Sequence, residues 1–196
     1  MPHDAGDGNL ARMDSRAFTE TILTNRFNRE ILARLPSLAL PDAWLVSGSL
    51  FQTVWSVQTG RAPEYGIKDY DIFYFDPDLS WEAEDAVIKR AAACFDDLDV
   101  AVEVRNQARV RLWYAAKFSR PYPPVTRSTD GIDRFLMHTA QVGLRPDGEI
   151  YAPRRFDDIE AMVIRPNYTA NFHPDRYREK AERWKERWPE LTILPA

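Results

Sequence analysis

The stretch "GIKDYDIFYFD" (residues 66–76) places two acids, Asp69 and Asp71, at the start of a segment that otherwise has the composition of a β-strand. Aromatic and β-branched residues fill most of positions 70–75, and such residues are enriched in strands. Acidic side chains inside such a strand are costly unless a partner compensates their charge. The stretch therefore predicts a strand whose two acids bind a partner that compensates their charge.

The spacing of the two acids indicates what they could hold. Residues two apart on a strand point to the same face, with Cα atoms about 6.5 Å apart. Two carboxylates that close repel each other unless a cation lies between them, and an oxygen-rich site suits magnesium. An Asp-x-Asp pair also occurs in turns and helix caps, and we interpret Asp76-Pro77-Asp78 nearby as such a turn.

The composition limits the classes of protein to which the chain can belong. It has 196 residues, 44% of them hydrophobic, and its one cysteine, Cys94, cannot form an internal disulfide. We see no secretory signal and no apolar run of the ~18 residues that a membrane helix needs, so we expect a cytoplasmic protein without a membrane partner.

A net charge of −4 argues against general DNA binding. Residues 76–103 carry nine acids and two bases, whereas residues 105–134 carry seven bases and two acids. This asymmetry fits either solvated faces or an acidic metal site beside a wall suited to phosphates.

Hydrophobic periodicity predicts alternating helices and strands. Expected helices cover 14–35, 50–58, 80–94, 106–118, 129–137 and 174–188, and expected strands cover 43–46, 69–75 and 99–105. A hairpin across "PDG" is expected at 139–153. We therefore predict an α/β (or α+β) domain around a small mixed sheet flanked by helices. Residues 1–13 are expected to be disordered, and residues 14–196 to form a single domain with a C-terminal helix.

Two further features could complete a site. Glu103 lies on the polar face of the strand after the Asp-x-Asp strand, where it could reach the same metal, although it could equally pair with Arg105. Gly48-Ser49 lies between a strand and a helix, where glycine lets a phosphate approach the backbone and the helix start supplies amide donors. Each feature alone is weak, but their order along the chain is informative.

This ordered set resembles the nucleotidyltransferase superfamily, whose signature is a Gly-Ser or Gly-Gly turn, an Asp-x-Asp or Asp-x-Glu strand and a third carboxylate. The segment "TGRAPEYGIKDYDI" is also similar to the loop that leads into the paired acids of tRNA CCA-adding enzymes. A closer likeness, from about Trp44 to Pro166, is to a bacterial nucleotidyltransferase family of uncertain substrate. It is carried by "QTVW", "TGRAPEYGIKDYDIFYFD", "LSWEAED", "VEVRNQARVRLWY" and "YAP".

The resemblance implies a nucleotidyltransferase fold and a magnesium-dependent transfer of a nucleoside monophosphate from a nucleoside triphosphate to an acceptor hydroxyl, with release of pyrophosphate. It implies two Mg²⁺ ions (Mn²⁺ is an alternative) held by Asp69, Asp71 and Glu103, which would be the catalytic residues. The nucleotide phosphates would bind to these residues: Gly48, Ser49, Lys68, Arg105 and Arg109. The acceptor is left open as a small molecule, an RNA end or a protein.

Two competing functions remain at this stage. The protein could be a catalytically silent nucleotide-binding or regulatory protein with the same fold, such as an antitoxin-like partner. It could also be a metal-dependent phosphohydrolase that uses the same acids. The three carboxylates favour the transferase over a pure binder, and no additional histidine or aspartate ligand set supports the hydrolase.

Overall fold

Five short and medium strands form the central sheet of the computed structural model, which describes residues 12–196. Together with a second, two-stranded sheet, the described residues contain seven strands: β1 (Trp44–Val46), β2 (Asp69–Tyr74), β3 (Ala101–Asn106), β4 (Gly143–Leu144), β5 (Ile150–Tyr151), β6 (Val163–Ile164) and β7 (Thr192–Ile193). The order in the main sheet is β3-β2-β1-β4-β5, in which only β2 and β3 run parallel. Strands β6 and β7 pair in parallel as a separate small sheet.

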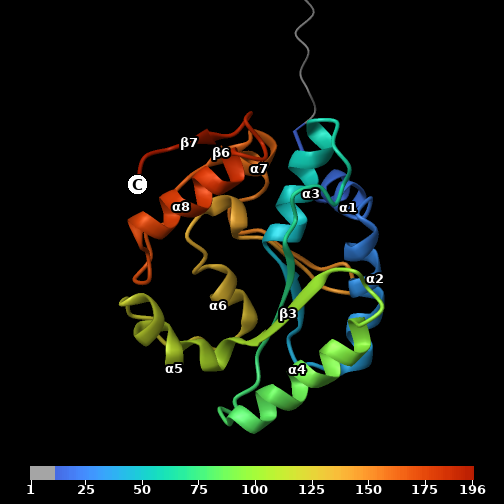
Figure 1. The fold of residues 1–196 in the computed structure, drawn as a ribbon, viewed down its shortest axis with the longest axis vertical. Helices are drawn as coiled ribbons and strands as arrows, with labels where there is room; N and C mark the ends of the chain where they lie inside the picture. Colours follow the sequence, from blue (N-terminus) through green and yellow to red (C-terminus); the bar gives the residue numbers. More distant parts are fainter. Residues whose placement is uncertain (1–11) are drawn as a thin grey trace, which may run out of the picture.

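Helices pack on both faces of this sheet. They are α1 (Ser15–Ile22), α2 (Arg26–Arg34), α3 (Gly48–Gln58), α4 (Trp81–Phe95), α5 (Gln107–Phe118), α6 (Ser128–Ile132), α7 (Asp157–Glu160) and α8 (Pro174–Lys185), with 3₁₀ turns at Leu35–Leu38 and His138–Ala140. In Figure 1, α1, α2 and α3 lie on one side of the strands, and α5, α6 and α8 lie on the other. Within residues 12–196, no helix combines the length and the apolar character that crossing a membrane requires.

The predicted mixed sheet flanked by helices is confirmed, and most expected elements are found within a few residues of their predicted bounds. The expected helix over 14–35 is instead two helices, α1 and α2. The chain breaks at Asn25, whose side chain caps α2 by accepting hydrogen bonds from the amides of Phe27 and Asn28 at 2.9 and 3.3 Å. The expected helix over 129–137 is shorter and ends at Ile132.

The expected domain division is only partly covered by the described residues. Residues 1–11, which include most of the segment expected to be disordered, lie outside the described range. Met13 belongs to the folded part, because its amide donates to the Glu160 carboxylate at 3.1 Å. The assignment of residues 14–196 to one domain stays a prediction.

Strand β2 separates the hydrophobic core from the polar face of the sheet. Tyr70, Ile72 and Tyr74 are buried to within 1% of complete burial and pack in the main core with α1–α4. The alternate residues, Asp69, Asp71 and Phe73, are only partly buried and lie on the other face, where they line the same spaces as residues of α6 and α8. A strand whose one face lies in the core therefore fixes where its two acids point.

Gly66 joins the loop before β2 to the C-terminal part of the chain. Its φ of +72° is one that L-residues rarely adopt, and a Cβ at this position would lie 2.7 Å from Cη2 of Trp188. The Trp188 ring is fully buried and packs edge-on against Trp55 at 5.6 Å, so it cannot move aside. Gly66 thus lets the loop approach the segment that follows α8.

We expect Gly66→Ala to destabilise the fold more than Gly60→Ala. Both residues have φ near +70°, but a Cβ on Gly60 would meet nothing within 4 Å. Gly60→Ala should cost only the conformational penalty of about 1–2 kcal/mol, whereas Gly66→Ala should add roughly 1–3 kcal/mol of overlap with the indole ring. Urea unfolding of the two variants measures the difference, and equal losses would contradict this packing.

Candidate active site

The three predicted carboxylates share one face of the sheet. In the parallel pairing of β2 and β3, Asp71 lies directly opposite Glu103, and Asp69 lies opposite Ala101. Directly opposed residues on neighbouring strands point to the same side, with strands about 4.8 Å apart. The sheet therefore brings Glu103 next to Asp71, as the sequence predicts.

Glu103 also has the alternative partner that its sequence neighbourhood suggests. Its carboxylate lies 3.2 Å from a guanidinium nitrogen of Arg105, and both side chains are about half exposed. Among residues 12–196, no three acidic, histidine or cysteine side chains converge closely enough to form a ready-made metal site. Glu103 would have to release Arg105 in order to bind a metal ion together with Asp71.

The surroundings of Asp71 create a need for positive charge. Burial of its carboxylate, together with the negative charge of Asp69, raises the pKa of Asp71 to about 7. Glu103 adds to this rise, while Lys180 and Arg105 oppose it. A divalent cation between the carboxylates would offset this repulsion, and carboxylate oxygens are the ligands that magnesium prefers. The donor set therefore fits a hard divalent cation.

A polar pocket of about 220 Å³ opens over Asp69 and Asp71. Ser47 and Gly48, at the turn from β1 into α3, form one wall. Ser47 has a φ of 58° and a ψ of −116°, a strained conformation for a residue with a side chain. Such strain is found at sites where the backbone must approach a ligand. The turn places Gly48, the first residue of α3, at the pocket, so the N-terminus of this helix adjoins it.

Gln52, one turn further along α3, also lines this pocket. The side chain is 7% exposed, yet its Oε1 has no hydrogen-bond partner among the described residues. A buried amide oxygen without a partner is costly in a folded protein. A ligand that donates a hydrogen bond in the pocket would satisfy it.

Another part of the lining of the polar pocket is basic and comes from α8 and from Arg187, two residues after the end of this helix. Lys180, Arg183 and Arg187 line the pocket at helical spacing. No acidic side chain within residues 12–196 forms an ion pair with any of the three. Burial lowers the pKa of Lys180, and the charge of Asp71 opposes that fall. These cations therefore remain available for an anion.

Sequence reasoning missed these three basic residues. The aromatic stripe of this segment predicts that the helix docks, and its members Tyr177, Ala181, Trp184 and Trp188 are indeed buried. Lys180, Arg183 and Arg187 lie next to that stripe and recur every three or four residues, which is the signal that could have found them. What the sequence does not state is that the helix docks beside the acids.

Of the other residues predicted to bind phosphate, the structure places some at the polar pocket and others away from it. Lys68 lines the polar pocket, with its Nζ 3.8 Å from Asp69. Ser49 is fully buried within α3 and does not line the pocket; Ser47 occupies that place instead. Arg109 is also outside the pocket, because its guanidinium is buried in an ion pair with Glu84 at 2.7 Å. Arg105 lines a neighbouring cavity rather than the polar pocket.

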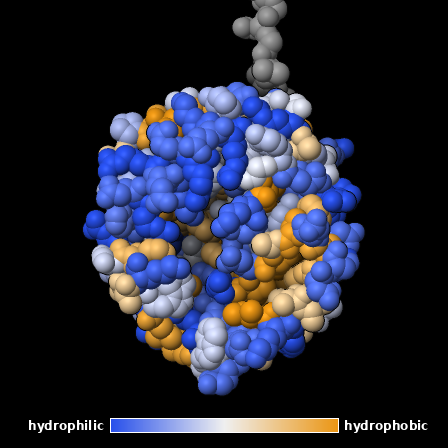
Figure 2. Space-filling model, in the orientation of Figure 1, coloured by the Kyte–Doolittle hydropathy of each residue, from blue (hydrophilic) through white to orange (hydrophobic). Residues whose placement is uncertain are grey.

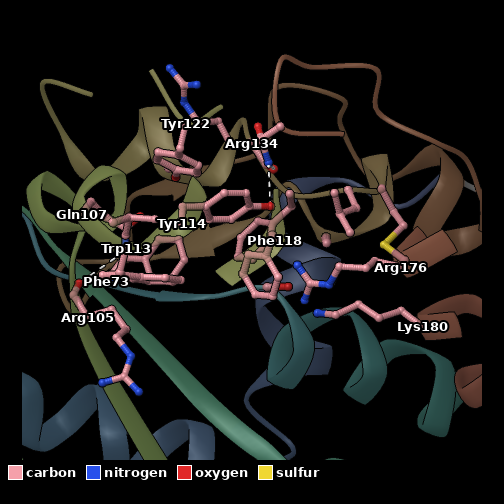
Figure 3. A pocket seen from close by; sticks show the side chains of 18 of the residues that line it. Phe73, Arg105, Gln107, Trp113, Tyr114, Phe118, Tyr122, Arg134, Arg176 and Lys180 are labelled. Atoms are coloured by element: carbon pink, nitrogen blue, oxygen red, sulfur yellow. Dashed lines mark hydrogen bonds between the residues drawn. The ribbon is translucent and has the colours of Figure 1, made fainter. Parts of the chain in front are cut away.

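That neighbouring cavity, which we call the aromatic cavity, has a volume of about 200 Å³. It shares Ser47, Phe135, Lys180 and Trp184 with the polar pocket, so the two spaces adjoin. Figure 2 shows the molecule hollowed near the middle of this face, between α8 and α5 of Figure 1. Figure 3 shows the side chains around the cavity: Phe73, Arg105, Gln107, Trp113, Tyr114, Phe118, Tyr122, Arg134, Arg176 and Lys180.

Comparisons with known proteins give a family for the sequence and a likeness of fold. The profile of a protein family described as Nucleotidyltransferase matches residues 33–193, which is most of the chain. A similar solved structure, described as an NMR structure that reveals a CCA-adding enzyme head domain, is 23% identical over 93% of this chain and 97% of that one, with a TM-score of 0.74. The crystal structure of the Bacillus stearothermophilus CCA-adding enzyme in complex with CTP is 18% identical over 88% of this chain and 41% of that one, with a TM-score of 0.45. None of the curated proteins matches the sequence significantly. At 23% identity, the first of these solved structures shows likeness of fold alone.

We expect Asp71→Asn to stabilise the metal-free protein at high pH. The pKa of Asp71 is raised from 3.8 to about 7 on folding, so its contribution to stability is full below pH 4 and is lost as the pH rises through 7. Asparagine carries no charge, so the variant should unfold at higher urea than the wild type at pH 8 but not at pH 4. The measurement is urea unfolding with EDTA, and the exposed Asp99→Asn serves as the control. Equal pH dependence in wild type and Asp71→Asn would refute the shift.

Proposed function

This chain belongs to the nucleotidyltransferase family, and we propose that it transfers a nucleoside monophosphate from a nucleoside triphosphate to an acceptor hydroxyl, with release of pyrophosphate. The single observation that carries this proposal is the polar pocket. Two carboxylates line it together with three basic side chains that form no ion pair with an acidic side chain of residues 12–196. Carboxylates facing unpaired cations across one space suit a polyphosphate bound together with a divalent cation.

The triphosphate would bind between the α3 turn and α8. The amides at the start of α3 and the backbone of Gly48 would donate to the terminal phosphates, with support from the helix dipole. Lys180, Arg183 and Arg187 would neutralise the phosphate charges from the other side. The exposed Lys68 would contribute from the edge of the pocket.

Asp69, Asp71 and Glu103 would hold the divalent cations. In this chemistry two Mg²⁺ ions, or Mn²⁺ in their place, stabilise the charge on the attacking and leaving oxygens. The residues fit this role because Asp71 lies beside both other carboxylates and its pKa is raised to about 7 by burial and by the charge of Asp69. Glu103 would release Arg105 to complete the set.

The reaction joins the acceptor oxygen to the α-phosphorus and breaks the bond from that phosphorus to the bridging oxygen. Pyrophosphate leaves with the electron pair, and the acceptor proton passes to the carboxylate of Asp71 or Glu103. Lys180 is well placed to stabilise charge during this step, because it lines both the polar pocket and the aromatic cavity. The pocket walls hold the reactants in line, which is the larger part of catalysis in phosphoryl transfer.

The alternative is a catalytically silent protein that binds nucleotide in the same pocket as a regulatory or antitoxin-like partner. Such a protein needs the basic wall but not three carboxylates on one face of the sheet. The juxtaposition of Asp71 with Glu103 supports the enzyme. A nucleotide that binds tightly but releases no pyrophosphate with any acceptor would favour the alternative.

Purified protein should transfer label from an α-labelled nucleoside triphosphate to a pooled acceptor fraction in the presence of Mg²⁺ or Mn²⁺. Asp71→Asn should lower the rate at least roughly hundredfold, because metal-assisted charge stabilisation contributes several kcal/mol and each 1.4 kcal/mol is tenfold in rate. Asp99→Asn, on the surface, should retain full activity. Transfer that persists in Asp71→Asn would refute the assigned role of this carboxylate.

The basic wall generates a binding prediction that does not depend on turnover. Arg183→Gln should weaken binding of a nucleoside triphosphate about tenfold, the value of one charge-assisted hydrogen bond to phosphate. Arg178→Gln is the matched control, since Arg178 is an exposed arginine of α8 that pairs with Asp175 and does not line the pocket. Isothermal titration calorimetry gives both dissociation constants. Equal affinity of the two variants would argue against phosphate binding at α8.

A further inference from the structure

The aromatic cavity lies next to the carboxylates along strands β2 and β3. Phe73 and Arg105, which line it, are two residues beyond Asp71 and Glu103 on the same faces of β2 and β3. Gly48 and the cations Arg183 and Arg187 line only the polar pocket, whereas Ser47 and Lys180 line both spaces. The carboxylates therefore lie between the proposed triphosphate site and this second space.

Aromatic residues are prominent in the cavity wall (Figure 3): seven of the 19 residues that line it have aromatic rings. Tyr114 packs against Phe118 with centroids 4.7 Å apart and against Tyr122 at 4.8 Å, and Trp113 lies 6.2 Å from Phe118. Rings that already pack on one another form a rigid surface, on which another ring can stack or pack edge-on. A volume of about 200 Å³ accommodates a single small ring system.

The remaining side chains give the cavity a positive charge. The basic residues Arg105, Arg134, Arg176 and Lys180 line it, and no carboxylate does. The Arg176 guanidinium lies 3.6 Å from the ring centroid of Phe118, and that of Arg134 lies 4.9 Å from Tyr122. These contacts hold both guanidinium groups at the wall of the cavity, where they favour an anionic group on the bound molecule.

We propose that the aromatic cavity binds the acceptor, and that the acceptor is a small molecule with a planar ring, an acidic group and a hydroxyl. This inference rests on the proposed function, because the aromatic cavity can hold the acceptor only if the neighbouring carboxylates catalyse the nucleotide transfer. The ring packs among Trp113, Phe118 and Tyr122, the acidic group meets Arg176, and the hydroxyl extends toward Asp71. The enclosed volume favours a small molecule over a protein or RNA surface.

The test uses three probes, each built on one six-membered ring with a hydroxymethyl group. 4-(Hydroxymethyl)benzoate has the ring, the acid and the hydroxyl; benzyl alcohol lacks the acid; 4-(hydroxymethyl)cyclohexanecarboxylate lacks the planar ring. Calorimetry should show the benzoate binding at least about tenfold more tightly than either of the others, because each of them loses one charge-assisted or aromatic contact. The benzoate should bind equally well when the protein is saturated with a nucleoside triphosphate.

Variants locate the binding. Arg176→Gln should weaken the benzoate about tenfold without changing the dissociation constant of the triphosphate, and Arg178→Gln on the same helix should change neither. Trp113→Ala should weaken the benzoate, whereas Leu112→Ala, which removes an exposed neighbour outside the cavity, should not. Intact folding of all variants is checked by urea unfolding.

Each outcome separates this inference from the proposed function. Triphosphate binding without any preference for the benzoate overturns the acceptor site and leaves the proposed function in place. Competition between the benzoate and a nucleoside also overturns it, because the cavity would then hold the nucleobase. A benzoate that binds as expected to a protein that binds no triphosphate contradicts the proposed function instead.

Discussion

The need to compensate a buried negative charge organises this part of the molecule. Strand β2 has one face in the hydrophobic core, which forces Asp69 and Asp71 to the other face, side by side. The parallel neighbour β3 adds Glu103 next to Asp71. The charges of Asp69 and Glu103 raise the pKa of Asp71, and Arg105 of β3 offsets this rise only in part. Further positive charge comes from Lys180 of α8 and from the other basic residues that line the polar pocket.

Helix α8 shows how one element serves two purposes. Its aromatic stripe packs against α3 through Trp184, which lies 5.1 Å from Phe51 and 6.0 Å from Trp55. The adjoining basic residues then face the acids without any need for a flexible loop. Because the cations are carried by a docked helix, their positions are fixed before a ligand arrives, and such preorganisation lowers the cost of binding.

Local patterns in the sequence predicted the sheet, the paired acids and the partner strand of Glu103, because strand alternation and order along the chain determine these features. They did not predict which cations would face the acids, since this depends on where a distant helix docks. Ser49 and Arg109 show the same limit. Ser49 is one residue past the turn and points into the core, and Arg109 is held by Glu84, a residue of α4. Spacing gives the candidate groups, but the packing decides which of them reach the pocket.

The place of α8 in the chain has a consequence for synthesis. All five strands of the main sheet precede α8, so a chain emerging from the ribosome can assemble the acidic face before the basic wall exists. Until residues 174–188 have been made and have docked, the nascent domain carries the acidic face of the sheet without the basic residues that line the same pocket. Under the proposed function, competence to bind a triphosphate would be acquired only after α8 has docked, and a chain cut short before α8 would retain the carboxylates alone.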